Sequence, residues 1–200
     1  KDIDGAADRV ALVATTDEEI GSFTSRKLIM DLSSKAKAVL VLEASLGGKV
    51  KTGRKGTAMY KINVHGLAAH AGLEPEKGVN ATVEIAHIIL QLSALENTEH
   101  GTTVVPTLLK SGNSANTVPD LAVLEIDARS FAQSELERID AAVKAIKPTI
   151  ADARLEITGG LNRPPLEPSS TKELYERIER VAKEIGMAPL GCAEVGGASD

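Results

Sequence analysis

Residues 10–43 read VALVATTDEEIGSFTSRKLIMDLSSKAKAVLVLE, and this stretch predicts the fold of the first part of the chain. Two short apolar runs, residues 10–14 and 38–42, are bounded by polar residues, which is typical of strands buried on both faces. Between the runs, the apolar residues of 28–32 follow a helical spacing. The stretch therefore predicts a strand–helix–strand unit of a parallel sheet.

Acidic residues follow both apolar runs: Asp17, Glu18 and Glu19 come two threonines after the first run, and Glu43 comes directly after the second. The carboxyl ends of parallel strands meet at one edge of a sheet, where ligand sites form, so these side chains are expected there. Carboxylates held close together repel each other unless a cation neutralises them, and divalent metal ions accept carboxylate oxygen. A helix N-terminus, where acidic residues suit the helix dipole, is the alternative interpretation of the first three.

The same residues resemble the motifs of a known enzyme family. Thr16-Asp17-Glu18-Glu19-Ile20-Gly21-Ser22 and, after the second run, Leu42-Glu43-Ala44 are similar to the zinc metallopeptidase family of glutamate carboxypeptidase, acetylornithine deacetylase, succinyl-diaminopimelate desuccinylase and aminoacylase. The resemblance implies that Glu18 is the general base and that Glu19 and Glu43 are ligands of a site with two zinc ions, or with cobalt or manganese in their place. A glutamate as the last of these acids resembles the carboxypeptidase and deacylase branches more than the aminopeptidase branch.

Over residues 54–160 the pattern changes to amphipathic helices and to strands with one polar face. Residues 60–65 and 124–129 alternate apolar with polar side chains, as strands buried on one side do. The expected elements occur in the order strand, helix, strand, strand, helix, strand, over residues 60–65, 80–95, 102–109, 124–129, 134–147 and 155–157. This order predicts a ferredoxin-like α+β domain, in which two helices cover one face of an antiparallel sheet.

Local signals give the orientation and the starts of the helices. The packed side of the helix at 80–95 is expected to hold Val83, Ala86, Ile89 and Leu90. Ser134-Glu135-Leu136-Glu137 and Ser170-Thr171-Lys172-Glu173 have the sequence of capping boxes, so each is expected to open a helix.

The predicted fold class is α/β, in which a ferredoxin-like domain interrupts a zinc-peptidase-like catalytic domain. The expected division is 1–53 for the first part of the catalytic domain, 54–160 for the insert and 161–200 for the second catalytic part. The resemblance implies that the insert is a dimerisation or lid domain that forms a homodimer. It also implies further ligands, in a His-x-Asp segment, a bridging Asp and a distal His, which these residues lack. The chain is therefore expected to be an internal portion of a longer enzyme.

Two loops of the insert carry candidate substrate-binding residues. Gly66-Leu67-Ala68-Ala69-His70-Ala71-Gly72 is rich in small residues, which let a ligand approach the imidazole closely, although an ordinary polar loop is the alternative. The stretch resembles a family motif whose His reaches across the dimer and stabilises the oxyanion in the partner's active site. Asn116, in a segment that by itself predicts a turn, resembles an asparagine of the family that contacts substrate.

Two arginines are candidates for binding a substrate carboxylate. Arg129 lies on the polar face of a predicted strand, where a cross-strand ion pair with Glu125, Asp127 or Glu156 is the alternative. The resemblance implies that this guanidinium binds the carboxylate, and Arg163 is expected to assist it.

The final residues, Gly196-Gly197-Ala198-Ser199-Asp200, resemble a family turn whose backbone amides line the substrate pocket. A plain glycine turn is the alternative interpretation of this segment.

The composition is that of an ordinary globular protein and excludes several classes of function. The chain has 200 residues, 42% of them hydrophobic, and a formal net charge of −5, which disfavours nucleic acid and anionic membranes as partners. Its single cysteine, Cys192, excludes an internal disulfide and a zinc site made of several thiolates, and suits a reducing, cytoplasmic location. No apolar run is long enough for a membrane span.

The sequence thus predicts a metal-dependent hydrolase that cleaves an amide or peptide bond beside a free carboxylate, as a carboxypeptidase of glutamate-type substrates does. The expected substrate is a small carboxylate-bearing peptide or an N-acyl amino acid. Two alternatives remain: a deacylase or desuccinylase of the same family that acts on N-acyl amino acids, and a non-catalytic dimerisation module.

Overall fold

The computed structural model describes residues 9–198 of the chain. These residues form two compact units, residues 9–44 and residues 45–198. The combination of helices and sheets is that of a mixed α/β protein, as the sequence predicts. Within the described part of the chain, every helix is too short or too polar to span a lipid bilayer.

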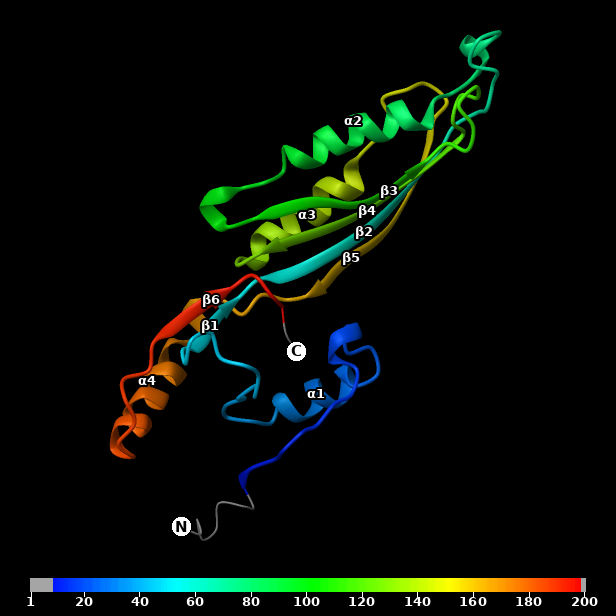
Figure 1. Ribbon diagram of the computed structural model, residues 1–200. Helices are drawn as coiled ribbons and strands as arrows, with labels where there is room; N and C mark the ends of the chain where they lie inside the picture. The colour runs from blue at the N-terminus through cyan, green and yellow to red at the C-terminus, as the bar shows by residue number, and fades with distance from the viewer. Residues whose placement is uncertain (1–8, 199–200) are drawn as a thin grey trace. The chain divides into compact units, whose positions relative to one another are not determined.

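A four-stranded antiparallel sheet is the centre of the larger unit (Figure 1). The strand order is β3-β4-β2-β5, so that β2 and β4 lie in the middle and β3 and β5 are the edges. Its elements in chain order are β2 (Gly56–His65), η3 (Pro75–Lys77), α2 (Ala81–Ser93), η4 (Thr98–His100), β3 (Thr103–Ser111), β4 (Leu121–Ser130), α3 (Gln133–Ala145) and β5 (Arg154–Arg163). Apart from the two short 3₁₀ helices, this is the predicted order, and the ferredoxin-like prediction is confirmed.

The helices α2 and α3 lie on one face of this sheet, and the apolar core fills the space between them and the sheet (Figure 1). Along β2, Tyr60, Ile62 and Val64 point into the core and are at most 3% exposed. Lys61, which alternates with them, is exposed, as is Met59. The predicted alternation of buried and polar residues is therefore confirmed for this strand.

The side of helix α2 that packs against the sheet differs from the predicted side. Its buried residues are Ala81, Glu84, Ile85, Ile88 and Leu92. Ile89 is partly buried as expected, but Ala86 is exposed, and Val83 and Leu90 are 44% and 70% exposed. The prediction was wrong because this helix has apolar residues on more than one side, so that its spacing fits two overlapping stripes. The second stripe, consisting of Val83, Ala86 and Leu90, remains on the surface.

A smaller sheet in the same unit joins segments that lie far apart in the sequence. β1 (Val50–Arg54) and β6 (Cys192–Val195) are parallel neighbours, and α4 (Pro168–Glu184) packs against β1. The hydroxyl of Thr171 in α4 donates to the carbonyl of Thr52 in β1 at 2.7 Å. The residues after the four-stranded sheet thus return to the segment that precedes it.

Neither of the predicted capping boxes forms. Helix α3 begins at Gln133 and α4 begins at Pro168, one or two residues before the expected serine caps, and neither N-cap side chain accepts a hydrogen bond from its own helix. Glu167, at the N-cap of α4, instead accepts the backbone N–H of Gln133 at 3.1 Å. The start of α3 is therefore capped through a tertiary contact, which the local sequence does not reveal.

The smaller unit contains η2 (Glu18–Ile20) and α1 (Arg26–Ser33), so the predicted helix is confirmed. The predicted strands at 10–14 and 38–42 are absent, and their side chains are exposed, with Leu12 at 84% and Leu42 at 87%. A strand forms through hydrogen bonds to a neighbouring strand, and an apolar run alone does not supply that neighbour. These two runs have no ladder partner among residues 9–198.

A buried carboxylate links α2 to the loop that follows α3. Glu84 is completely buried, and its two carboxylate oxygens accept the backbone N–H groups of Thr149 at 3.0 and 3.1 Å and of Ile150 at 2.7 Å. Backbone groups thus replace the water that a buried charge loses.

Replacing Glu84 with Gln should lower the free energy of unfolding by about 2–3 kcal/mol, because the amide NH₂ group would face backbone N–H donors. Urea unfolding measures this change. The matched control, Glu173→Gln on the exposed surface of α4, should stay within about 0.5 kcal/mol of the unmodified protein. Equal stability of the two variants would contradict this role for Glu84.

Candidate functional site

The acidic turn of the smaller unit is built around Asp17. This side chain is 7% exposed, and its Oδ2 accepts the backbone N–H of Thr24 at 2.8 Å, the hydroxyl of Thr24 at 2.6 Å and the backbone N–H of Ser25 at 3.2 Å. Hydrogen bonds from Ser25 and Thr24 hold the pKa of the Asp17 carboxyl well below its ordinary value. Asp17 thus holds Thr24 and Ser25, the two residues directly before α1.

Glu18 and Glu19 form the next turn, η2, which closes at Gly21. The N–H of Gly21 donates to the carbonyl of Glu18 at 2.9 Å, and Gly21 has φ = 102°, a left-handed conformation that favours glycine. Glu18 is partly exposed and Glu19 is exposed. Both carboxylates therefore have access to solvent at the end of the first apolar run.

The carboxylates of Glu18, Glu19 and Glu43 suit a divalent cation chemically. Within residues 9–198, however, no three His, Cys, Asp or Glu side chains come together as a metal-binding group. The described residues thus supply donor atoms but not a complete ligand set. The assignments of Glu18 as base and of Glu19 and Glu43 as ligands stay predictions.

Two predicted substrate-binding residues, His70 and Asn116, lie in adjacent loops at one end of the four-stranded sheet. The N–H of Ala71 donates to the carbonyl of Asn116 at 2.8 Å, and the N–H of Val118 donates to the carbonyl of Ala69 at 2.9 Å. These bonds form a short antiparallel bridge between the two loops. Residues 46 positions apart in the sequence are therefore held side by side.

The ring of His70 is oriented by its own loop. Its Nδ1 accepts the backbone N–H groups of Gly72 and Leu73, both at 3.2 Å. A nitrogen that accepts hydrogen bonds carries no proton, so the proton of the neutral imidazole is at Nε2. His70 is exposed and can therefore offer Nε2–H as a donor to an oxygen atom outside the loop.

The two predicted arginines lie together at the opposite end of the sheet. Thr57 of β2 pairs with Arg129 on β4 and with Arg163 on β5, so the three residues form one rung. Residues directly opposite each other in antiparallel strands project to the same face, and the Cα atoms of the two arginines are about 10 Å apart at the usual strand spacing.

Arg129 forms the ion pair that was the alternative interpretation of this residue. Its Nε and Nη2 donate to the two carboxylate oxygens of Asp127 at 2.7 and 3.0 Å, and Nη1 donates to the carbonyl of Gly196 at 3.1 Å. The hydrogen bonds that Arg129 donates to Asp127 raise the pKa of Arg129 above its ordinary value. The side chain of Arg129 is 37% exposed and stays charged, and the Gly196 turn lies directly beside its guanidinium group.

The length of the sheet separates the two groups. Leu121 pairs with His65 at the end that carries the His70 and Asn116 loops, and Arg129 lies eight residues further along β4. At about 3.3 Å per residue, the Cα atoms of Leu121 and Arg129 are roughly 26 Å apart. A small substrate cannot touch both groups of one chain.

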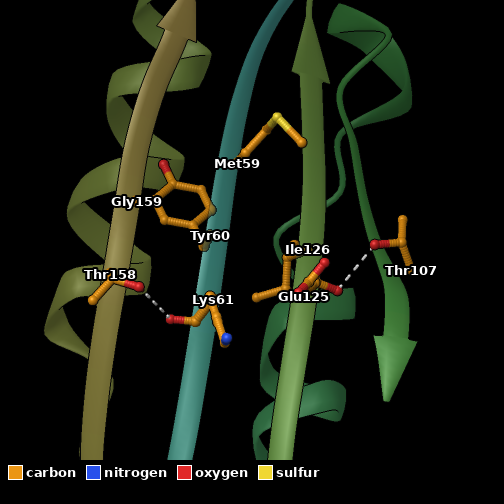
Figure 2. Close-up of a pocket in the computed structure, with 8 residues that line it drawn as sticks. All are labelled: Met59, Tyr60, Lys61, Thr107, Glu125, Ile126, Thr158 and Gly159. Atoms are coloured by element: carbon orange, nitrogen blue, oxygen red, sulfur yellow. Dashed lines mark hydrogen bonds between the residues drawn. The ribbon is translucent and has the colours of Figure 1, made fainter. Parts of the chain in front are cut away.

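A shallow depression on the sheet does not coincide with either group. Its lining residues are Met59, Tyr60, Lys61, Thr107, Glu125, Ile126, Thr158 and Gly159 (Figure 2). Hydroxyls of Thr158 and Thr107 donate to the backbone carbonyls of Lys61 and Glu125, at 3.4 and 3.2 Å (Figure 2). The lining of this depression contains none of the predicted site residues.

Sequence patterns did not reveal two further contributors. Asp127 was only one of three possible partners of Arg129. Arg54 in β1 was not singled out, although it donates to the carbonyls of Gly197 and Ala198. The Arg54 contacts join residues more than 140 positions apart, so only the structure could identify them, whereas Asp127 lies two residues from Arg129 on the same strand. The predicted Gly196–Asp200 turn is described as far as Ala198, and its last two residues lie outside the described part of the chain.

The sequence profile of a protein family described as "Peptidase dimerisation domain" matches residues 52–155, more than half of the chain. Carboxypeptidase G2 of Pseudomonas sp. (strain RS-16) is 34% identical over 202 aligned positions, which cover 96% of this chain and 47% of that enzyme. The chain belongs to the M20 peptidase family. The dimerisation profile thus covers β2, β3 and β4 of the ferredoxin-like sheet of this M20 chain and ends at the start of β5.

Other relatives are named as an amidohydrolase and as a subunit of a hydrolase. N-carbamoyl-L-amino-acid amidohydrolase of Rhizobium meliloti is 27% identical over 185 positions, covering 87% of this M20 chain and 42% of that enzyme. One subunit of the p-aminobenzoyl-glutamate hydrolase of Escherichia coli (strain K12) is 34% identical over 74 positions, or 36% of this chain and 17% of that protein. The chain spans about half the length of the curated relatives that it matches over nearly its whole extent.

Solved structures share the M20 fold. Aminopeptidase PepT from Bacillus cereus superposes with a TM-score of 0.72 at 23% identity, over 92% of this chain and 50% of that one. A tripeptidase from Staphylococcus aureus gives a TM-score of 0.71 at 21% identity, with the same coverage. At these identities the likeness concerns the fold and not the substrate.

Proposed function

We propose that this M20 protein is a metal-dependent hydrolase that cleaves an amide or peptide bond beside a free carboxylate, as a carboxypeptidase of glutamate-type substrates. The observation that carries the proposal is the rung with Arg129 and Arg163, because two guanidinium groups on one face suit a substrate with two carboxylates. The names of two relatives, carboxypeptidase G2 and p-aminobenzoyl-glutamate hydrolase, support this substrate class.

In the proposed reaction, Glu18 takes the proton of the attacking water molecule and passes it to the leaving amine. Glu19 and Glu43 contribute carboxylate ligands for the metal ions, for which zinc is the first choice and cobalt or manganese are alternatives. Metal bound there would supply a polarised water molecule. Arg129, assisted by Arg163, orients the substrate carboxylates.

His70 and Asn116 complete the proposed site from a second copy of the chain. The Nε2–H of His70 donates to the oxyanion that forms when water adds to the carbonyl, and Asn116, held beside it, contacts the substrate. Because roughly 26 Å of sheet separate these two residues from Arg129, each active site takes them from the partner subunit.

The proposed homodimer forms through the ferredoxin-like domain. β3 is an edge strand that exposes Val105 and Leu109, at 46% and 51%. The exposed apolar stripe of α2, Val83, Ala86 and Leu90, lies on the helix that contacts β3. Edge strands and apolar stripes of this kind are covered when a second copy binds. The dimerisation profile over residues 52–155 supports this assignment.

Two further assignments belong to the same proposal. The domain division stays 1–53 and 161–200 for the two catalytic parts and 54–160 for the insert. A cytoplasmic location is supported by the single cysteine, which leaves no internal disulfide.

An N-acyl amino acid deacylase is the second candidate, which the amidohydrolase relatives favour. It would use the same base and the same arginines, because an N-acyl amino acid also carries a carboxylate. A non-catalytic dimerisation module is the third, and it predicts no turnover of any substrate.

Arg129→Met in the full-length protein tests the proposed substrate class. With an N-acyl glutamate, the variant should lose about 100-fold in kcat/KM, because a charge-assisted pair to the carboxylate is lost. With the corresponding glutamine derivative as substrate, the unmodified enzyme should already be slow. Equal rates on both substrates, or an unchanged kcat/KM in the variant, would argue against the two-carboxylate site.

A further inference from the structure

We infer that Arg54 is a positioning residue of the active site, which fixes the Gly196–Ala198 turn together with Arg129. The inference rests on the proposed function, in which this turn borders the substrate. Arg54 ends β1, and it lies outside the four-stranded sheet that carries Arg129 and Arg163.

Three successive carbonyls of the turn accept hydrogen bonds from the two arginines. Nη1 of Arg129 donates to Gly196 O at 3.1 Å, and Nη1 of Arg54 donates to Gly197 O at 3.3 Å and Ala198 O at 3.0 Å. The turn begins directly beside Arg54, because Arg54 pairs with Val195 at the end of β6. The strands β1 and β4, which start more than 70 residues apart in the sequence, thus both hold the Gly196–Ala198 turn.

The glycines of the turn explain why it needs external contacts. A Cβ on Gly196 or Gly197 would meet no atom within 4 Å, and neither residue has a left-handed φ. Neither crowding nor strain therefore requires glycine here. Two consecutive glycines leave the backbone with unusual conformational freedom, and the guanidinium groups restrict it.

Fixing the carbonyls also fixes the N–H groups. In a trans peptide the C=O and the following N–H point in opposite directions. The hydrogen bond from Arg129 to Gly196 O therefore directs the N–H of Gly197 away from Arg129. In the same way, the hydrogen bond from Arg54 to Gly197 O directs the N–H of Ala198 away from Arg54. A cation at the carbonyl end also polarises the peptide and strengthens the N–H as a donor. The two amides are thereby prepared to bind an anionic oxygen of the substrate.

Arg54→Met in the full-length enzyme tests the inference. KM for the N-acyl glutamate should rise roughly 10-fold while kcat changes little, because ground-state contacts of the amides are lost. The ¹⁵N order parameters of the Gly197 and Ala198 amides should fall without a change in melting temperature, because the backbone of the turn gains freedom. Arg180→Met, an exposed arginine of α4, is the matched control and should leave both readouts unchanged.

Arg54→Lys keeps the charge but not the planar fork, and should give an intermediate KM. If the melting temperature of Arg54→Met is lowered, Arg54→Lys is compared with the unmodified enzyme instead. If KM and the ¹⁵N order parameters of both Arg54→Lys and Arg54→Met equal those of the unmodified enzyme, the inference is overturned. If the unmodified enzyme hydrolyses none of the substrates, the proposed function fails, and the order parameters still decide whether Arg54 holds the turn.

Discussion

Replacing Glu18 with Gln should reduce kcat of the full-length enzyme by about 10²–10⁴-fold. The amide has nearly the same shape as the carboxylate but cannot accept the proton of the attacking water. Because Glu18 is the proposed base and not a ligand, the metal content should remain unchanged. Turnover of an N-acyl glutamate and elemental analysis of the purified variant measure the two quantities.

Glu19→Gln is the matched control in the next position of the same turn. This variant should lose bound metal as well as activity, because Glu19 is the proposed ligand. Near-normal turnover of Glu18→Gln with full metal content would rule out its role as base. The reverse pattern, with metal lost from Glu18→Gln and retained in Glu19→Gln, would exchange the two assignments.

His70→Asn should lower kcat by about 10²–10³-fold, since the donor to the oxyanion is lost in the transition state. The oxygen of Asn can replace Nδ1 as acceptor of the Gly72 and Leu73 N–H groups, so the loop should keep its conformation. His70→Gln, whose longer side chain can place an N–H near the position of Nε2, should retain more activity than His70→Asn.

The tautomer itself can be observed without turnover. In protein labelled with ¹⁵N at histidine, the His70 signal should be that of the Nε2–H form, and it is assigned by its absence in His70→Asn. A Nδ1–H signal would contradict the orientation of the ring. A kcat of His70→Asn equal to that of the unmodified enzyme would show that the donor has no catalytic part.

The ferredoxin-like sheet could be predicted because its signals are local. Tyr60, Ile62 and Val64 alternate with polar residues, and the order of strands and helices is compatible with few topologies. The side of α2 that packs could not be predicted, because Leu90 and Leu92 are equally apolar and only the sheet distinguishes them. The runs at 10–14 and 38–42 have the composition of strands, but a strand also requires a neighbour.

The same limit applied to the candidate site, where local motifs were informative and tertiary contacts could not be predicted. The types of residue that could act, such as Glu18 and His70, were evident from short motifs. Their arrangement was not: the pairing of the His70 loop with Asn116, and the contact of Arg129 with Gly196, depend on residues distant in sequence. Arg54 has no local pattern at all, so its contacts with the turn emerge only from the parallel pairing of β1 with β6.

The central claim is that the two ends of the four-stranded sheet serve different active sites of a dimer. Mixing inactive His70→Asn and Arg129→Met proteins under conditions that exchange protomers tests it most directly. If His70 acts on the partner's site, each mixed dimer has one site with both lesions and one intact site, so an equal mixture should recover about a quarter of the unmodified activity. If both residues serve the site of their own chain, every site carries a lesion and no activity returns. Recovery is the result that we predict, and a mixture as inactive as its components, despite exchange, would contradict the account.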